Sequence, residues 1–139
     1  MAISFFTEDI KFDLKNKLAV KKWIQATAKA EGKKLKEINY IFCSDEYLLN
    51  INQTYLDHDT YTDIVTFDNS EKEGEIISDI FISVERTREN AQKFSVPEID
   101  ELHRVMIHGV LHLCGYKDKT DAQQKLMREK EDFYLGTRS

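Results

Sequence analysis

The chain has 139 residues, of which 41% are hydrophobic and 32% are charged, and its formal net charge is -5. A chain of this size is expected to form one domain, residues 1–139, and to bury a core without disulfide bonds. The acidic balance argues against nonspecific binding to nucleic acid, DNA included, and no apolar stretch approaches the ~20 residues of a membrane span.

The first residues and the cysteines indicate the compartment. No basic segment followed by an apolar run is visible at the start of the sequence, so no secretory signal is expected. Cys43 and Cys114 form no spacing typical of a disulfide framework or a CxxC site. Together these features predict a cytoplasmic protein without a membrane partner.

The first half of the chain alternates between strand and helix patterns. Residues 3–6 alternate as a short strand, and residues 20–28 show apolar side chains at helical spacing before Gly32 ends the helix. A second strand is predicted over residues 38–43, and Ser44 is placed to cap a short helix after it.

Two further strands are predicted over residues 62–67 and 76–84. The polar link between them is too short for a helical crossover, so this pair should be antiparallel. Helices follow to the end of the chain. The order β-α-β-α-β-β then helices predicts an α+β fold, with a mixed four-stranded sheet and a histidine-bearing helix packed on it.

That helix begins near Pro97 and carries His108 and His112, four residues apart. Side chains at this spacing lie on one face of a helix, so both imidazoles can approach one ion. A lone HxxxH pair is more often two ordinary surface or core histidines. Zinc that performs chemistry needs a third protein ligand and keeps one position open.

Asp118 is the candidate third ligand, provided that the helix ends before it. At about 100° per residue, a continuous helix would point Asp118 roughly 240° away from His112. Gly115 can end the helix in a left-handed conformation and let the chain turn Asp118 back. Gly109 lowers helix stability by about 1 kcal/mol relative to alanine, which suggests that room is needed beside the metal or its ligand.

The other two histidines have simpler interpretations. His103 lies about 140° around the helix from His108 and is expected to be exposed to solvent. His58 lies between Asp57 and Asp59 in a loop, where an ordinary loop role is favoured over a role near the metal or the substrate.

The spacing H-x3-H-x5-D resembles the zinc signature of the metzincin proteases. Those enzymes carry glutamate after the first histidine as general base, and Gly109 stands at that position here. A metallopeptidase therefore remains an alternative that lacks its proton acceptor.

A closer resemblance is to the YbeY family of bacterial ribosomal-RNA maturation factors, endoribonucleases with the signature HGxLHLxGYDH. The run HGVLHLCGY at residues 108–116 follows this signature through the tyrosine. Upstream, NQTY at 52–55 and DTYTDIVTF at 59–67 are similar to the family's N-x-x-Y-R and D-x-P-T-D-V-L-S-F, and SDIFIS at 78–83 resembles G-D-I-x-I-S. The resemblance covers most of the chain.

Two positions depart from the family pattern. Lys117 and Asp118 stand where the family has Asp-His, so a carboxylate replaces the third imidazole. Aspartate binds zinc well, but its negative charge should raise the pKa of zinc-bound water. Leu56 replaces the arginine after Asn-x-x-Tyr, so any phosphate contact of that arginine must come from another residue.

The resemblance implies a zinc-dependent, single-strand-specific endoribonuclease acting in 16S ribosomal RNA 3' end maturation and ribosome quality control. Its partners would be ribosomal RNA precursor and the ribosome or its proteins. His108, His112 and Asp118 would hold one zinc ion, and the expected nucleophile is a metal-bound water. The general base is left open, with Asp63, His58 and Lys117 as possible helpers. The alternative from another class is a non-catalytic, zinc-containing ribosome assembly factor, in which the zinc is structural and the lysine-rich first helix docks on RNA or a ribosomal protein.

Overall fold

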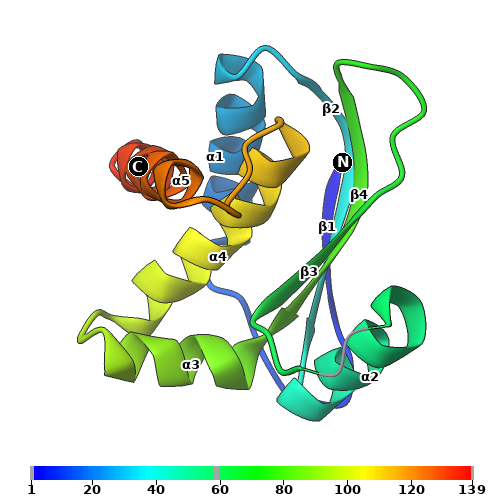
Figure 1. Ribbon diagram of the computed structural model, residues 1–139, viewed down its shortest axis with the longest axis vertical. Coiled ribbons are helices and arrows are strands. Elements are labelled where there is room, and N and C mark those ends of the chain that lie inside the picture. Colours follow the sequence, from blue (N-terminus) through cyan, green and yellow to red (C-terminus); the bar gives the residue numbers. More distant parts are fainter. Residues whose placement is uncertain (1, 58–59, 139) are drawn as a thin grey trace.

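The computed structural model describes residues 2–57 and 60–138, which form helices and one mixed sheet (Figure 1). In chain order the elements are β1 (Ile3–Thr7), α1 (Lys17–Ala30), β2 (Lys34–Cys43), α2 (Asp45–Leu56), β3 (Ile64–Asp68), β4 (Glu75–Ser83), α3 (Val84–Lys93), α4 (Glu98–Leu113) and α5 (Asp121–Leu135). The α+β fold class predicted from the sequence is confirmed.

The sheet has the strand order β1-β2-β4-β3. β1 pairs with β2 and β2 pairs with β4, both in parallel, whereas β3 pairs with β4 in antiparallel register from Ile64 opposite Ile82 to Asp68 opposite Ser78. The predicted antiparallel hairpin is therefore confirmed. It places the start of β3 beside the end of β4, where the Ser83 amide donates to the Asp63 carbonyl at 3.0 Å.

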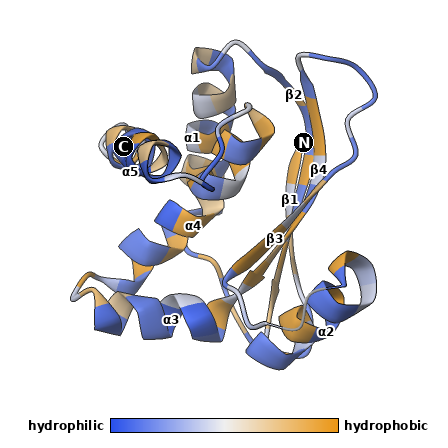
Figure 2. Ribbon diagram, in the orientation of Figure 1, coloured by the Kyte–Doolittle hydropathy of each residue, from blue (hydrophilic) through white to orange (hydrophobic). Residues whose placement is uncertain are grey.

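The two faces of the sheet are covered unequally. The main core lies on the face that carries α1, α4 and α5, with fully buried side chains such as Tyr40, Ile80 and Met106. A smaller cluster of Cys43, Leu48 and Val65 lies under α2 on the other face. Figure 2 shows hydrophobic residues along the strands and hydrophilic ones in the loop between β3 and β4.

Helix α4 lies close to β3 and β4 because Gly109 has no side chain. A Cβ atom at Gly109 would meet Ile64 Cδ1 at 3.0 Å, Thr66 Oγ1 at 3.2 Å and Ile80 Cδ1 at 3.3 Å. The room that this glycine provides is thus filled by side chains of the sheet, and it sets how closely the histidine-bearing helix approaches β3. None of the helices in the described part of the chain is long and apolar enough to cross a membrane.

Candidate metal centre

Helix α4 ends at Leu113, one residue after His112, in a glycine motif. Gly115 has a φ of +105°, a conformation that L-residues rarely adopt, and beyond its two chain neighbours no atom of the described residues lies within 4 Å of a Cβ built there. The Gly115 amide donates to the His112 carbonyl at 3.0 Å, and the Tyr116 amide donates to the Leu111 carbonyl at 3.1 Å. This pair of bonds is the Schellman motif, which caps the last carbonyls of a helix. The predicted helix end at Gly115 is confirmed.

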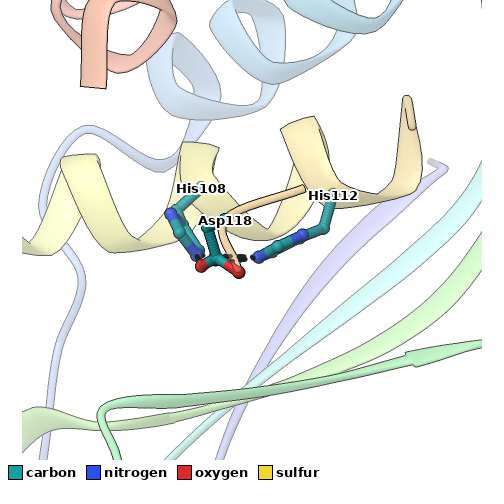
Figure 3. Close-up of side chains that lie close together, drawn as sticks. All are labelled: His108, His112 and Asp118. Atoms are coloured by element: carbon teal, nitrogen blue, oxygen red, sulfur yellow. Dashed lines mark hydrogen bonds and ion pairs between the residues drawn. The ribbon is translucent and has the colours of Figure 1, made fainter. Parts of the chain in front are cut away.

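The turn after this motif brings Asp118 back to the two histidines. Asp118 Oδ2 lies 3.3 Å from Nε2 of His108 and 3.3 Å from Nε2 of His112. In Figure 3 both rings point toward the carboxylate between them, on the side of α4 that faces the strands. The three donor atoms all lie within 4.8 Å of one another. The structure thus places the three sequence-predicted ligands together.

The spacing of these donors fits one small cation. A tetrahedral zinc ion with bonds of about 2.0–2.1 Å separates two of its ligand atoms by roughly 3.3 Å. The two nitrogen-to-oxygen distances match this value, while the Nε2 atoms of His108 and His112 are closer, at 2.9 Å. Two imidazole nitrogens and one carboxylate oxygen are the donor set of a catalytic zinc site with one coordination position left for water.

Hydrogen bonds at the other ring nitrogens set the tautomers of both histidines. His112 Nδ1 lies 2.9 Å from the Tyr116 carbonyl oxygen, and His108 Nδ1 lies 2.6 Å from Glu131 Oε2. Because both acceptors are oxygens, each Nδ1 carries the proton and donates it. Both Nε2 lone pairs are then free for a metal, an arrangement that fixes ring orientation in metal sites.

Glu131 reaches His108 from α5 and is itself held firmly. Its side chain is buried, at 5% exposure, and Arg104 Nη1 donates to its other oxygen, Oε1, at 3.0 Å. Arg104 also contacts Asp132 Oδ1 at 2.7 Å through Nη2. Sequence reasoning missed Glu131, because it is one of several acids in a charged helix and lies in no motif with the histidines.

The electrostatic surroundings of His108 favour its charged form. Burial lowers the pKa of the ring, but the hydrogen bond to Glu131 and the nearby carboxylates of Asp118 and Asp63 raise it more, so the net pKa is above the ordinary value. A divalent cation at Nε2 would benefit from the same negative charges.

Two cavities meet at this cluster. The larger, of about 540 Å³, runs along β3 and is lined by Asn52 and threonine side chains as well as by both histidines. The smaller, of about 330 Å³, opens between α3, α4 and α5. Asp63, Ile64, His108 and Asp118 line both, so the candidate centre lies where the two cavities join.

Of the two possible helpers that the structure describes, Asp63 and Lys117, Asp63 lies at the centre. It lines both cavities, and burial raises the pKa of its carboxyl above the ordinary value, although the nearby His108 acts in the opposite direction. Lys117 is exposed and lines neither cavity. His58 lies outside the described residues. Leu56, at the position of the family's arginine, lines the larger cavity, to which the described residues contribute no lysine or arginine.

The expectation for His103 was wrong. Its side chain is buried, at 9% exposure, because α1 and the C-terminal segment cover this face of α4: the ring centroid lies 5.4 Å from that of Trp23, and Nδ1 lies 2.8 Å from Arg138 Nη1. Burial and the neighbouring Arg138 lower the pKa of His103 to about 4.

Comparisons with known proteins show the family of this chain. The family model described as Endoribonuclease YbeY matches residues 2–138. A protein of Cytophaga hutchinsonii named Endoribonuclease YbeY is 53% identical over 136 residues, covering 98% of this chain and 95% of its own length. A protein of the same name from Flavobacterium psychrophilum is 55% identical over 127 residues, 91% of this chain and 90% of its own. The solution structure of a Thermotoga maritima protein superposes with a TM-score of 0.62 at 30% identity, covering 96% of this chain and 86% of that one.

Proposed function

Because the chain belongs to the YbeY endoribonuclease family, we propose that it is a metal-dependent endoribonuclease in which His108, His112 and Asp118 hold one zinc ion. The observation that carries the proposal is the convergence of these three donors at the junction of two cavities. An open coordination position and room for a substrate on either side are what hydrolysis of an internal phosphodiester requires.

The chain's own residues would divide the work. A zinc ion bound here would supply Lewis acidity and lower the pKa of water. Glu131 and the Tyr116 carbonyl hold the two imidazoles in the tautomer that presents Nε2. Asp63 is placed to accept a proton, because its carboxyl lines both cavities, and the pKa that burial raises makes it a stronger base than an ordinary carboxylate.

The substrate we propose is single-stranded ribosomal RNA precursor, with cleavage contributing to 16S ribosomal RNA 3' end maturation and to ribosome quality control in the cytoplasm. Proteins recognise RNA sequence mainly in unpaired segments, whose bases can be separated and bound one at a time. The two cavities support this choice, since each has the size of a small-ligand pocket. The ribosome or ribosomal proteins would then be its partners.

The test compares the purified protein with its His108→Ala variant on a 16S ribosomal RNA precursor, with metal content measured for both. We expect cleavage at unpaired sites by the zinc-loaded protein, and loss of both cleavage and metal in the variant. A duplex of the same sequence should remain intact. Equal cleavage by both proteins would identify a contaminating nuclease and favour a non-catalytic assembly factor, while cleavage of unstructured protein would favour a metallopeptidase.

A further inference from the structure

The smaller cavity contains a buried acid that the proposed metal chemistry does not use. Glu101, in the first turn of α4, is 5% exposed and lines this cavity. Within the described ranges 2–57 and 60–138, its one polar contact is with Arg104, whose Nε lies 3.9 Å from Oε1, which is beyond hydrogen-bond distance. The Glu101 oxygens are not among the buried polar atoms that lack a partner, so they remain accessible from the cavity, and a ligand bound there can donate a hydrogen bond to them.

The pKa of Glu101 is consistent with a carboxylate that lacks a hydrogen-bond donor. Burial raises the pKa of its carboxyl above the ordinary value, and the nearby Arg104 offsets this only in part. Arg104 directs its two terminal nitrogens elsewhere, to Glu131 and Asp132. Glu101 therefore faces the cavity as an acceptor without a donor.

The mouth of the same cavity presents an aromatic ring. Phe94, directly after α3, lines the cavity and is 51% exposed, although large aromatic side chains are usually buried. Lys93 Nζ lies 5.7 Å from the centroid of its ring. Asn90, one turn earlier on α3, contributes an amide to the same wall. An exposed ring beside a positive charge is a surface on which a nucleobase can stack.

The charge of the cavity favours a base over a phosphate. Its lining includes Asp63, Glu101, Asp118 and Glu131, against the two cations Arg104 and Arg128. Arg104 is already paired with acids, and Arg128 lies 3.9 Å from Glu131. A phosphate would meet net negative charge, whereas the amino group of a base can donate to a carboxylate.

From these observations we propose that the smaller cavity binds the base of the nucleotide next to the cleaved phosphodiester. The base stacks on Phe94 and donates its exocyclic amino group to Glu101. Adenine, cytosine and guanine carry such a group and uracil does not, so the site favours these three bases over uracil. The inference rests on the proposed ribonuclease function, because Asp63, His108 and Asp118 connect this cavity to the metal centre.

The test measures RNA binding separately from cleavage. The full-length protein, kept metal-free by a chelator, is titrated into fluorescently labelled single-stranded oligoadenylate, oligocytidylate and oligouridylate. We expect the adenylate and cytidylate to bind more tightly than the uridylate. Glu101→Gln should reduce this preference by roughly three- to tenfold, because the amide lacks the negative charge and its NH2 group can donate to a uracil carbonyl, which a carboxylate cannot do.

A second variant probes the stacking surface. Phe94→Ala should weaken binding of all three oligonucleotides by about fivefold or more, because stacking does not distinguish the bases. Phe94 is exposed, so this variant tests the site even if Glu101→Gln fails to fold. The matched controls are Phe133→Ala, a 62% exposed phenylalanine that lines neither cavity, and Glu129→Gln, an exposed acid on α5. Both should bind like the unaltered protein.

The outcomes separate the subsite from the proposed function. RNA cleavage by the zinc-loaded protein, together with equal binding of the three oligonucleotides or a preference that survives Glu101→Gln, would overturn the subsite and leave the ribonuclease. If no RNA is bound or cut under any condition, both proposals fail. Cleavage at mixed-sequence sites should also shift toward uridine in Glu101→Gln.

Discussion

The Nδ1 atom of His108 lies 2.6 Å from Oε2 of Glu131, a residue that follows it by 23 positions and belongs to another helix. The carboxylate is buried and is held from its other side by Arg104. Although Glu131 is not a candidate ligand, it thus determines which ring nitrogen of His108 faces the candidate metal centre.

Replacing Glu131 with glutamine should weaken metal binding. The amide can still accept a hydrogen bond from His108, but it lacks the negative charge that favours a cation at the other nitrogen. Loss of such a partner typically lowers metal affinity 10- to 100-fold, and we expect roughly the lower value. Competition with a chromogenic chelator measures the affinity, and Glu129→Gln, at an exposed position of the same helix, serves as the control. An affinity equal to that of the control would show that Glu131 only supports packing.

The third ligand is tested by two substitutions at one position. Asp118→Ala removes the oxygen that lies 3.3 Å from both imidazoles and should lower zinc affinity by more than the roughly 100-fold upper range for an outer partner. Asp118→His supplies an imidazole instead and should retain zinc. Metal content after dialysis decides between them, with Asp121→Ala as control. Full retention of zinc by the alanine variant would mean that another residue is the ligand.

Replacing Gly115 with alanine should strain the turn before Asp118 and thereby lower zinc affinity as well as stability. Alanine at a φ of +105° is unfavourable by about 1–3 kcal/mol, because the left-handed region excludes most side chains. Relieving this strain would shift the turn that carries Asp118, so both stability and zinc affinity should fall. Gly32→Ala is the matched control: its φ is +76°, it also has no atom within 4 Å of a built Cβ, and it lies at the end of α1. That control should lose stability alone, measured by urea unfolding. Equal zinc affinities in the two variants would contradict the coupling.

The burial of His103 predicts a pH dependence of stability. In the unfolded chain its pKa is about 6.5, and in the folded protein it is about 4, so the unfolded state binds a proton first as the pH falls. The contribution of His103 is fully present above pH ~6.5 and is lost as the pH decreases toward 4. Urea unfolding of chelator-treated protein across this range should show a steeper loss than the His103→Gln variant. Parallel curves would show that folding does not shift the pKa of His103.

Local patterns in the sequence predicted the local parts of the site. The HxxxH spacing, the stop at Gly115 and the hairpin of β3 and β4 each depend on residues close together in the chain, and they follow from helix geometry, glycine conformation and loop length. The contacts of Glu131 and Glu101 depend on how α5, α3 and α4 pack, and no spacing in the sequence reports that packing. Gly109 is an example. The sequence indicated that space is needed beside this residue, but only the structure shows that side chains of the sheet fill that space.

The prediction for His103 was wrong because its exposure also depends on how the helices pack. Its position on α4, on a different face from His108, was predicted correctly, but no local pattern indicates that α1 and the C-terminal residues cover that face. The start of β2 was also placed late. Its first residues, from Lys34, are mostly polar and exposed, and they belong to the strand because the Lys34 amide donates to the Gly74 carbonyl at 2.8 Å.

The three candidate ligands lie within eleven consecutive residues, from His108 to Asp118, whereas Glu131 arrives on the last helix of the chain. Detachment of α5 would remove the partner of His108 Nδ1 and the hydrogen bond that Gln124 Nε2 donates to the Asp118 carbonyl, although none of the three candidate ligands belongs to that helix. If the proposed zinc ion binds at this centre, its affinity should therefore depend on whether the C-terminal helix is packed against α4.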